Sequence, residues 1–310
     1  MSSKHANVAI IDMGTNTFHL LIAEVGSKPR VLLREREAVK VGKGGINNKV
    51  ITPDGFERAL QTIRKFKAII DQHGVRKTLA FGTSAVRNAS NGGDLIEAIR
   101  ATTGIEARVI DGDEEADLIY RGVRAGLDLG KESSMIVDIG GGSVEFIIGS
   151  NDGIQWKRSF EIGGQRLLEE FQKTDPIGEQ QVRALEGFLA KQLEPLREQL
   201  KRYDPSTIVG VSGTFDTLSE MFCARQGLPY YADDSETPFD IEAFSSIYKD
   251  LLTHDRAGRL LLPGMIEMRV DMIVVACVLV NYLLSHHKFS NLRVSSYSLK
   301  EGVLASLLPS

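Results

Sequence analysis

Four acidic residues stand where a carboxylate can do chemistry. Asp12 and Asp138 each end an apolar run and precede glycine and small hydroxyl residues, in "IIDMGTNTF" and "IVDIGGGSV". Glu145 follows the second of these turns, and Glu115 lies in the first turn of an expected helix. Glycine and serine or threonine let an anion touch the main chain, where successive N–H groups bind phosphate. Carboxylates repel a phosphate unless a cation intervenes, so these residues predict a phosphate site with Mg²⁺.

The stretch around Asp12 recurs later in the chain. Placing "VAIIDMGTNTFHLLIAEV" over "MIVDIGGGSVEFIIG" aligns Asp12 with Asp138 at an offset of 126 residues. A second pair, "KTLAFGTSAVRNA" and "STIVGVSGTFDTL", recurs about 130 residues apart. Two unrelated elements at nearly one offset predict a duplicated domain. His19 takes the repeat position of Glu145, where it either faces the site or is a hydrogen-bonded structural histidine.

Each repeated unit reads as a β-hairpin with a glycine-rich tip. The spacing of a P-loop is absent, and the residues after the glycines are too β-branched to open a helix. The "GTSAVR" and "VSGTFDT" turns instead deliver a serine or threonine to a helix N-terminus. Such a residue either caps the helix or helps its free amides to bind an anion.

The rest of the chain predicts a globular protein of two domains. It has 310 residues, of which 42% are apolar and 25% charged. Amphipathic patterns over residues 53–74 and 177–200 predict helices that cover the sheets. The apolar run over residues 272–284 is too short for a membrane span and predicts a buried helix, so we expect a cytoplasmic protein. Cys223 and Cys277 lack metal-ligand spacing and are expected to be reduced core thiols.

Charge is distributed unevenly. The net charge is −4, but residues 1–125 carry +4 and residues 126–310 carry −8. Basic runs over residues 28–36 and 40–45 are either solvated faces or contacts for a polyanion.

Four linked motifs resemble the exopolyphosphatase and guanosine pentaphosphate phosphohydrolase family of the actin-like ATPase superfamily: "IIDMGTNTFHLLIAEV", "FGTSAVRNA", "IDGDEEADLIYRGV" and "IVDIGGGSVEFIIG". The resemblance implies an α/β fold of two duplicated actin-like (ribonuclease H-like) domains. Each would have a mixed sheet flanked by helices, with a cleft between the domains. We expect domain I at residues 1–125 together with about 300–310, and domain II at residues 126–299.

The same resemblance assigns roles to residues. It makes Glu115 the general base that acts on the attacking water, although local pattern alone would favour a helix-dipole role for it. Asp138 and Glu145 would hold Mg²⁺, with Asp12 at the equivalent tip of the first repeat. The residues implied to surround the phosphates are Asn16, Thr17, Ser84, Arg87, Gly140, Gly141, Gly142 and Ser143.

The predicted function is Mg²⁺-dependent removal of terminal orthophosphate from inorganic polyphosphate. The alternatives are hydrolysis of the 5′-phosphate of guanosine pentaphosphate, and a non-catalytic phosphate or nucleotide sensor. We expect no nucleic-acid or membrane partner, and a homodimer is left open. The chain departs from the family pattern in its second half, which makes the preferred substrate harder to predict; these departures are Ser212, Asp216, Ser296 and Ser298.

Overall fold

The computed structural model describes residues 6–26 and 29–308. Lys28 of the first basic run lies outside the described residues. The chain forms two compact units: unit 1 is Met1–Gly122 with Leu299–Ser310, and unit 2 is Val123–Ser298. We propose that these units are the two domains expected from the sequence.

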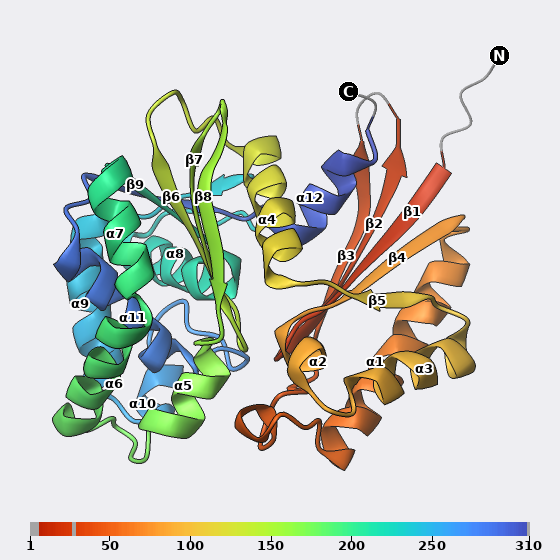
Figure 1. Ribbon diagram of the computed structural model, residues 1–310, viewed down its shortest axis with the longest axis horizontal. Helices are drawn as coiled ribbons and strands as arrows, with labels where there is room; N and C mark the ends of the chain where they lie inside the picture. Colours follow the sequence, from red (N-terminus) through yellow and green to blue (C-terminus); the bar gives the residue numbers. More distant parts are fainter. Residues whose placement is uncertain (1–5, 27–28, 309–310) are drawn as a thin grey trace. The chain divides into compact units, whose positions relative to one another are not determined.

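Unit 1 is built on a mixed five-stranded sheet with the order β3-β2-β1-β4-β5 (Figure 1). The first three strands pair antiparallel, whereas β4 and β5 run parallel to β1. Parallel pairing needs a crossover, and helices supply it here. The strands are β1 (Ala6–Met13), β2 (Thr17–Val25), β3 (Arg30–Ala38), β4 (Lys77–Gly82) and β5 (Ala107–Val109).

Helices α1 and α3 lie together over one face of this sheet (Figure 1). The unit 1 core forms there, between these helices and the apolar residues that alternate along β1 and β2. Thr52 caps α1, because its hydroxyl accepts from the Gly55 N–H at 3.3 Å. The helices of this unit are η1 (Ile46–Asn48), α1 (Pro53–Gln72), α2 (Ser84–Asn88), α3 (Gly92–Thr103), α4 (Gly112–Gly126), which runs on into unit 2, and α12 (Leu299–Ser306).

Unit 2 has a mixed six-stranded sheet with the order β10-β11-β9-β6-β7-β8. Every residue of β6 and β7 is buried, which explains their near-continuous apolar sequence. The strands are β6 (Ser134–Ile139), β7 (Val144–Ser150), β8 (Gly153–Phe160), β9 (Thr207–Val211), β10 (Glu236–Thr237) and β11 (Asn291–Ser295).

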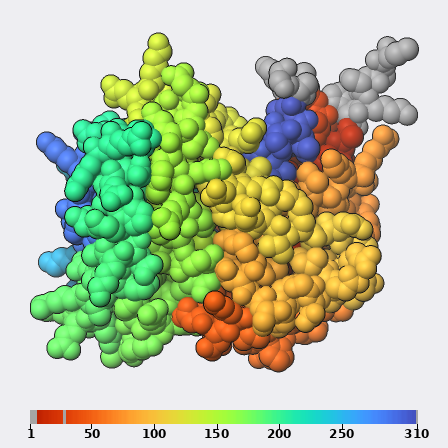
Figure 2. Space-filling view, in the orientation of Figure 1, coloured from red at the N-terminus to blue at the C-terminus, as the bar shows by residue number. Residues whose placement is uncertain are grey.

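The helices of unit 2 supply most of its apolar core, and side chains of α6 and α7 form part of its outer surface (Figure 2). The helix predicted over residues 177–200 is two helices, because Pro195 lies in the first turn of α7, where the lack of an N–H is tolerated, and breaks a continuous helix. The helices are α5 (Gly164–Phe171), α6 (Glu179–Gln192), α7 (Glu194–Tyr203), α8 (Ser212–Gln226), α9 (Ile241–Thr253), α10 (Arg256–Leu260) and α11 (Ile273–His286).

The predicted apolar helix is α11, whose residues are buried almost throughout. Among residues 6–26 and 29–308, no helix is both long and apolar enough to cross a membrane.

The two sheets repeat one another. Read from β8, the order of the unit 2 sheet begins β8-β7-β6-β9-β11, and that of the unit 1 sheet is β3-β2-β1-β4-β5. Strands at the same place in the two orders run in the same relative directions. Asp12 pairs with Phe81 on β4, as Asp138 pairs with Val211 on β9. The register therefore supports the duplication predicted from the two repeated elements.

Both cysteines are free and buried, as predicted. Burial raises the pKa of the Cys223 thiol and of the Cys277 thiol, so both stay protonated at neutral pH. We expect native protein to react with a thiol reagent such as DTNB far more slowly than protein unfolded in guanidinium chloride. Stoichiometric labelling of the native protein at the rate of a free thiol would contradict this packing.

Candidate active site

The backbone segment after β3 binds one side of the tip of the β1–β2 hairpin. The Gly14 N–H donates to the Thr17 carbonyl at 3.2 Å and closes the turn. The carbonyls of Thr15 and Asn16 accept from the N–H groups of Gly42 at 3.0 Å and Lys40 at 2.8 Å. In a trans peptide the carbonyl and the following N–H point in opposite directions. The N–H groups of Asn16 and Thr17 therefore point away from the supporting segment.

The glycine turn of unit 2 is built in the same way. The Gly140 N–H donates to the Ser143 carbonyl at 3.1 Å. Each glycine carbonyl of the turn accepts a hydrogen bond from the segment that starts α5. Gly140 accepts from the Gly164 N–H at 2.8 Å, Gly141 from the Gln165 N–H at 2.8 Å, and Gly142 from the Gly163 N–H at 3.1 Å. The N–H groups of Gly141, Gly142 and Ser143 consequently point to the other side together. Within the described part of the chain they have no protein acceptor, so three adjacent N–H donors are available to an anion.

Close packing requires a glycine at position 163, in the segment beside this turn. A Cβ on Gly163 would lie 2.5 Å from the carbonyl carbon of Gly141 and from the backbone nitrogen of Gly142. The two main-chain segments thus touch directly, and position 163 has no room for a side chain. One side of the glycine turn is fixed by backbone packing, and the opposite side presents its amides.

Asp138 and Glu145 face each other across neighbouring strands. They are directly opposed in the antiparallel β6–β7 pair, and only 7% and 2% of their surfaces are exposed. Both lie outside the main apolar cluster, to which their strand neighbours Val137, Ile139, Val144 and Phe146 belong. Strand alternation therefore turns the two carboxylates to the opposite face of the sheet.

Hydroxyl groups bind these two carboxylates. Ser159, on β8, donates to Oε1 of Glu145 at 2.6 Å. Ser212 and Ser298 each donate to Oδ2 of Asp138 at 2.8 Å. Two of the predicted departures from the family pattern thus lie at the predicted metal ligand.

The donor set of unit 2 fits Mg²⁺. Opposed carboxylates about 5 Å apart repel by about 3 kcal/mol at an effective dielectric constant of about 20, and a cation removes this cost. Among the residues that the structure describes, no group of three or more acidic, histidine or cysteine side chains is arranged to hold a metal. One or two carboxylates, with waters and substrate phosphate completing the shell, is the usual binding mode of Mg²⁺. Asp12 belongs to unit 1, and its role as a metal ligand stays a prediction.

In unit 1, Asp12 is opposed by His19 across the β1–β2 pair. This is the position that Glu145 takes opposite Asp138 in unit 2. An acid facing an imidazole avoids the repulsion of two acids, so the equivalent positions of the two units differ in chemistry.

Two neighbouring glutamates at the start of α4 point in different directions. Asp111 caps the helix, since its Oδ1 accepts from the Glu114 N–H at 2.8 Å. Glu114 turns outward and makes a two-bond ion pair with Arg108, which lowers the pKa of the Glu114 carboxyl. Glu115 turns inward: it is 7% exposed, and its Oε2 accepts from Nη1 of Arg87 at 2.8 Å. The capping and dipole roles thus belong to its neighbours.

Helix α2 carries two of the predicted phosphate contacts, Ser84 and Arg87. Ser84 is buried, and Arg87 also donates to the Ile110 carbonyl at 3.0 Å, which fixes its guanidinium beside Glu115. Thr83 makes no capping hydrogen bond at this helix, and the N-cap position of α8 is Val211. The serine and threonine residues of these turns are therefore not simple helix caps.

Sequence reasoning missed Arg269. A Cβ on Gly213 would lie 1.9 Å from Nη2 of Arg269, so this guanidinium packs directly on the first turn of α8. A cation at a helix N-terminus adds to the positive end of the helix dipole. The segment before α11 has no local pattern that identifies this arginine, because the contact joins residues far apart in sequence.

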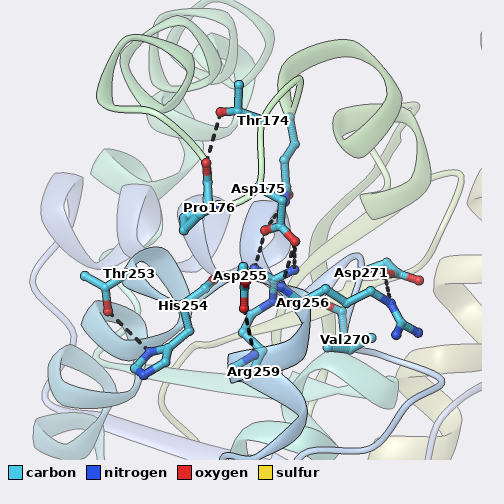
Figure 3. Close-up of polar contacts among 12 residues, drawn as sticks. Thr174, Asp175, Pro176, Thr253, His254, Asp255, Arg256, Arg259, Val270 and Asp271 are labelled. Atoms are coloured by element: carbon cyan, nitrogen blue, oxygen red, sulfur yellow. Dashed lines mark hydrogen bonds and ion pairs between the residues drawn. The ribbon is translucent and has the colours of Figure 1, made fainter.

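A buried ion pair anchors the segment that carries Arg269 (Figure 3). Arg259 is 1% exposed, and its Nη1 donates to Oδ1 of Asp175 at 2.6 Å. Its Nε donates to the carbonyl of Val270, the residue next to Arg269, at 3.1 Å. Arg256 adds a bond from Nε to Oδ1 of Asp271 at 2.9 Å. Pairing and hydrogen bonding of this buried arginine thus hold the Arg269 backbone in place.

Comparison with known proteins gives the family. A model of the Ppx/GppA phosphatase family matches residues 21–310. The chain belongs to this family. A solved structure of an exopolyphosphatase from Cytophaga hutchinsonii is 42% identical, with a TM-score of 0.94, and the match covers 98% of this chain and 99% of that one. The fold class implied by the motifs, duplicated actin-like α/β domains with mixed sheets, is confirmed, and so is the assignment as a phosphoanhydride hydrolase.

Two curated relatives also align with this Ppx/GppA protein. Exopolyphosphatase 1 of Mycobacterium tuberculosis is 26% identical over 307 residues, which are 98% of this chain and 88% of that protein. A bifunctional 3-dehydroquinate synthase/phosphatase of Fusobacterium nucleatum is 33% identical over 222 residues, 67% of this chain. The match spans only 33% of that longer relative.

The packing of the glycine turn can be tested with a matched pair of substitutions. We expect Gly163→Ala to lower the free energy of unfolding by about 1–3 kcal/mol, because the new methyl group overlaps backbone atoms. Gly187→Ala, within α6, has open space and should raise stability by up to about 1 kcal/mol through helix propensity. Urea denaturation measures both. Equal stability of the two variants would show that the turn is not close-packed against Gly163.

Proposed function

We propose that this Ppx/GppA protein is an exopolyphosphatase, which releases orthophosphate from the end of inorganic polyphosphate. The direction of the turn amides is the main support for this proposal. Gly141, Gly142 and Ser143 point their N–H groups to one side, where the described residues offer no acceptor. Three adjacent N–H donors match the oxygens of a phosphoryl group. Two of the relatives above are exopolyphosphatases by name, which favours polyphosphate over a guanosine nucleotide.

In the proposed reaction, Glu115 accepts a proton from the attacking water. The water oxygen forms a bond to the terminal phosphorus, and the bond from that phosphorus to the bridging oxygen breaks. Orthophosphate leaves, and the chain remains one phosphate shorter. The Arg87 ion pair orients the Glu115 carboxylate, and burial keeps other water away from it. A water nucleophile and a carboxylate base require no covalent intermediate.

Each unit has turn amides and cationic side chains that stabilise charge on phosphate oxygens. In unit 1 these donors are the N–H groups of Asn16 and Thr17 and the guanidinium of Arg87. In unit 2 they are the glycine-turn amides, and the guanidinium of Arg269 brings positive charge to the first turn of α8. Preorganised donors lower the barrier because they need no reorientation as charge develops. Mg²⁺ at Asp138 and Glu145 would neutralise charge on the phosphate that the unit 2 amides bind.

Phosphate release tests this proposal directly. The purified protein with Mg²⁺ is incubated with long-chain polyphosphate, guanosine pentaphosphate or ATP at equal concentrations of terminal phosphate. We expect polyphosphate to give the highest kcat/KM. A preference for guanosine pentaphosphate would replace the proposal with nucleotide hydrolysis. Binding without release from any of them would indicate a sensor.

The two glutamates of α4 give a matched pair for the base. We expect Glu115→Gln to lower kcat by about 10² or more with polyphosphate binding retained, because an amide cannot accept the proton. Glu114→Gln, one residue earlier, loses only an outward ion pair with Arg108 and should keep kcat near the native value. Initial rates of phosphate release measure both. Native kcat in Glu115→Gln would refute the base assignment.

A further inference from the structure

Three separated segments of unit 2 meet at the Asp138 carboxylate. Asp138 is the next-to-last residue of β6, Ser212 opens α8, and Ser298 is the last residue of unit 2 before α12. Both serine hydroxyls donate to the same oxygen, Oδ2, at 2.8 Å. The hydroxyls lie 3.4 Å from each other, but each has one hydrogen and gives it to the carboxylate. The arrangement places two charge-assisted hydrogen bonds on one oxygen atom.

Ser212 adopts a backbone conformation that favours glycine. Its φ is +65°, in the left-handed region that costs a residue with a side chain. By sheet register, the equivalent position of unit 1 is Gly82, since Phe81 and Val211 pair with the two repeated aspartates. A serine in a conformation suited to glycine has to be explained by its hydroxyl, and the only hydrogen bonds that this hydroxyl makes in the described structure are with Asp138 and Ser298.

We infer that Ser212 and Ser298 are positioning residues that hold the Asp138 carboxylate for the metal. Two donors from different directions stop the carboxylate from rotating, and they stabilise its ionised form inside a buried face. The orientation of Oδ1 is fixed as a consequence. Neither serine needs to touch the substrate or the metal to act in this way. The inference rests on the proposed function only in taking Asp138 as a metal ligand.

Metal binding without substrate tests the inference. Mn²⁺, a paramagnetic substitute for Mg²⁺, is titrated into the full-length protein, and the free ion is measured by electron paramagnetic resonance. We expect Ser212→Gly and Ser298→Ala each to weaken Mn²⁺ binding by about 10-fold or more, the scale found for residues that orient metal ligands. Ser298→Thr, which keeps a hydroxyl, should restore most of the affinity.

Stability separates positioning from a merely structural role. Ser212→Gly relieves the left-handed backbone strain but loses one hydrogen bond to Asp138, and the two effects on the free energy of unfolding oppose each other. The unfolding temperature should therefore stay close to the native value although metal affinity falls. Ser219→Ala is the matched control: this buried serine of the same helix donates to the Pro238 carbonyl at 2.6 Å. Its loss should lower the unfolding temperature and leave Mn²⁺ affinity unchanged.

Each outcome decides one statement. Native Mn²⁺ affinity in both Ser212→Gly and Ser298→Ala would overturn the inference, and so would a wild-type protein that binds no Mn²⁺. A different combination separates the inference from the proposed function. If the wild-type protein binds Mn²⁺ and the serine variants bind it weakly, the inference is supported. If that same wild-type protein releases no phosphate from polyphosphate, the proposed function fails.

Discussion

The structure of unit 2 depends on holding two acids, Asp138 and Glu145, directly opposite each other on a buried face. Like charges at opposed strand positions destabilise a sheet. The surrounding groups offset this cost: a hydroxyl donates to one carboxylate and two hydroxyls donate to the other. A cation would complete the neutralisation. The requirement explains why Ser159, Ser212 and Ser298, rather than apolar residues, lie beside these two carboxylates.

Duplication supplies a common scaffold on which the two units differ in chemistry. Each has an acid at the end of its central strand, a short turn, and a backbone segment that binds the carbonyl side of that turn. This arrangement turns amides to the opposite side in both units. Side chains at equivalent positions then diverge, as His19 and Glu145 do. Unit 1 carries the buried Glu115 and Arg87 pair, whereas unit 2 carries the opposed carboxylates and their hydroxyl donors.

Much of the fold follows from local pattern. The glycine-rich hairpins, the amphipathic helix α1 and the apolar helix α11 form where the sequence predicts them, because strand alternation, capping and continuous apolarity are local signals. The break between α6 and α7 also has a local signal, Pro195, which the long amphipathic pattern obscured. The nearly equal offsets of the two repeated motifs predicted a duplicated domain, and the matching strand order of the two sheets supports it.

The sequence by itself determined the family, the duplicated α/β fold and the residue types of the predicted site, because these depend on motifs within single strands, turns and helix starts. The tertiary structure decided the partners of those residues. It directed Glu114 to Arg108 but Glu115 to Arg87, brought Arg269 onto Gly213, and joined Ser212 and Ser298 at Asp138. These contacts connect segments far apart in the chain. A helix or strand pattern sets which face a side chain occupies, but only the packing of elements sets what it meets there.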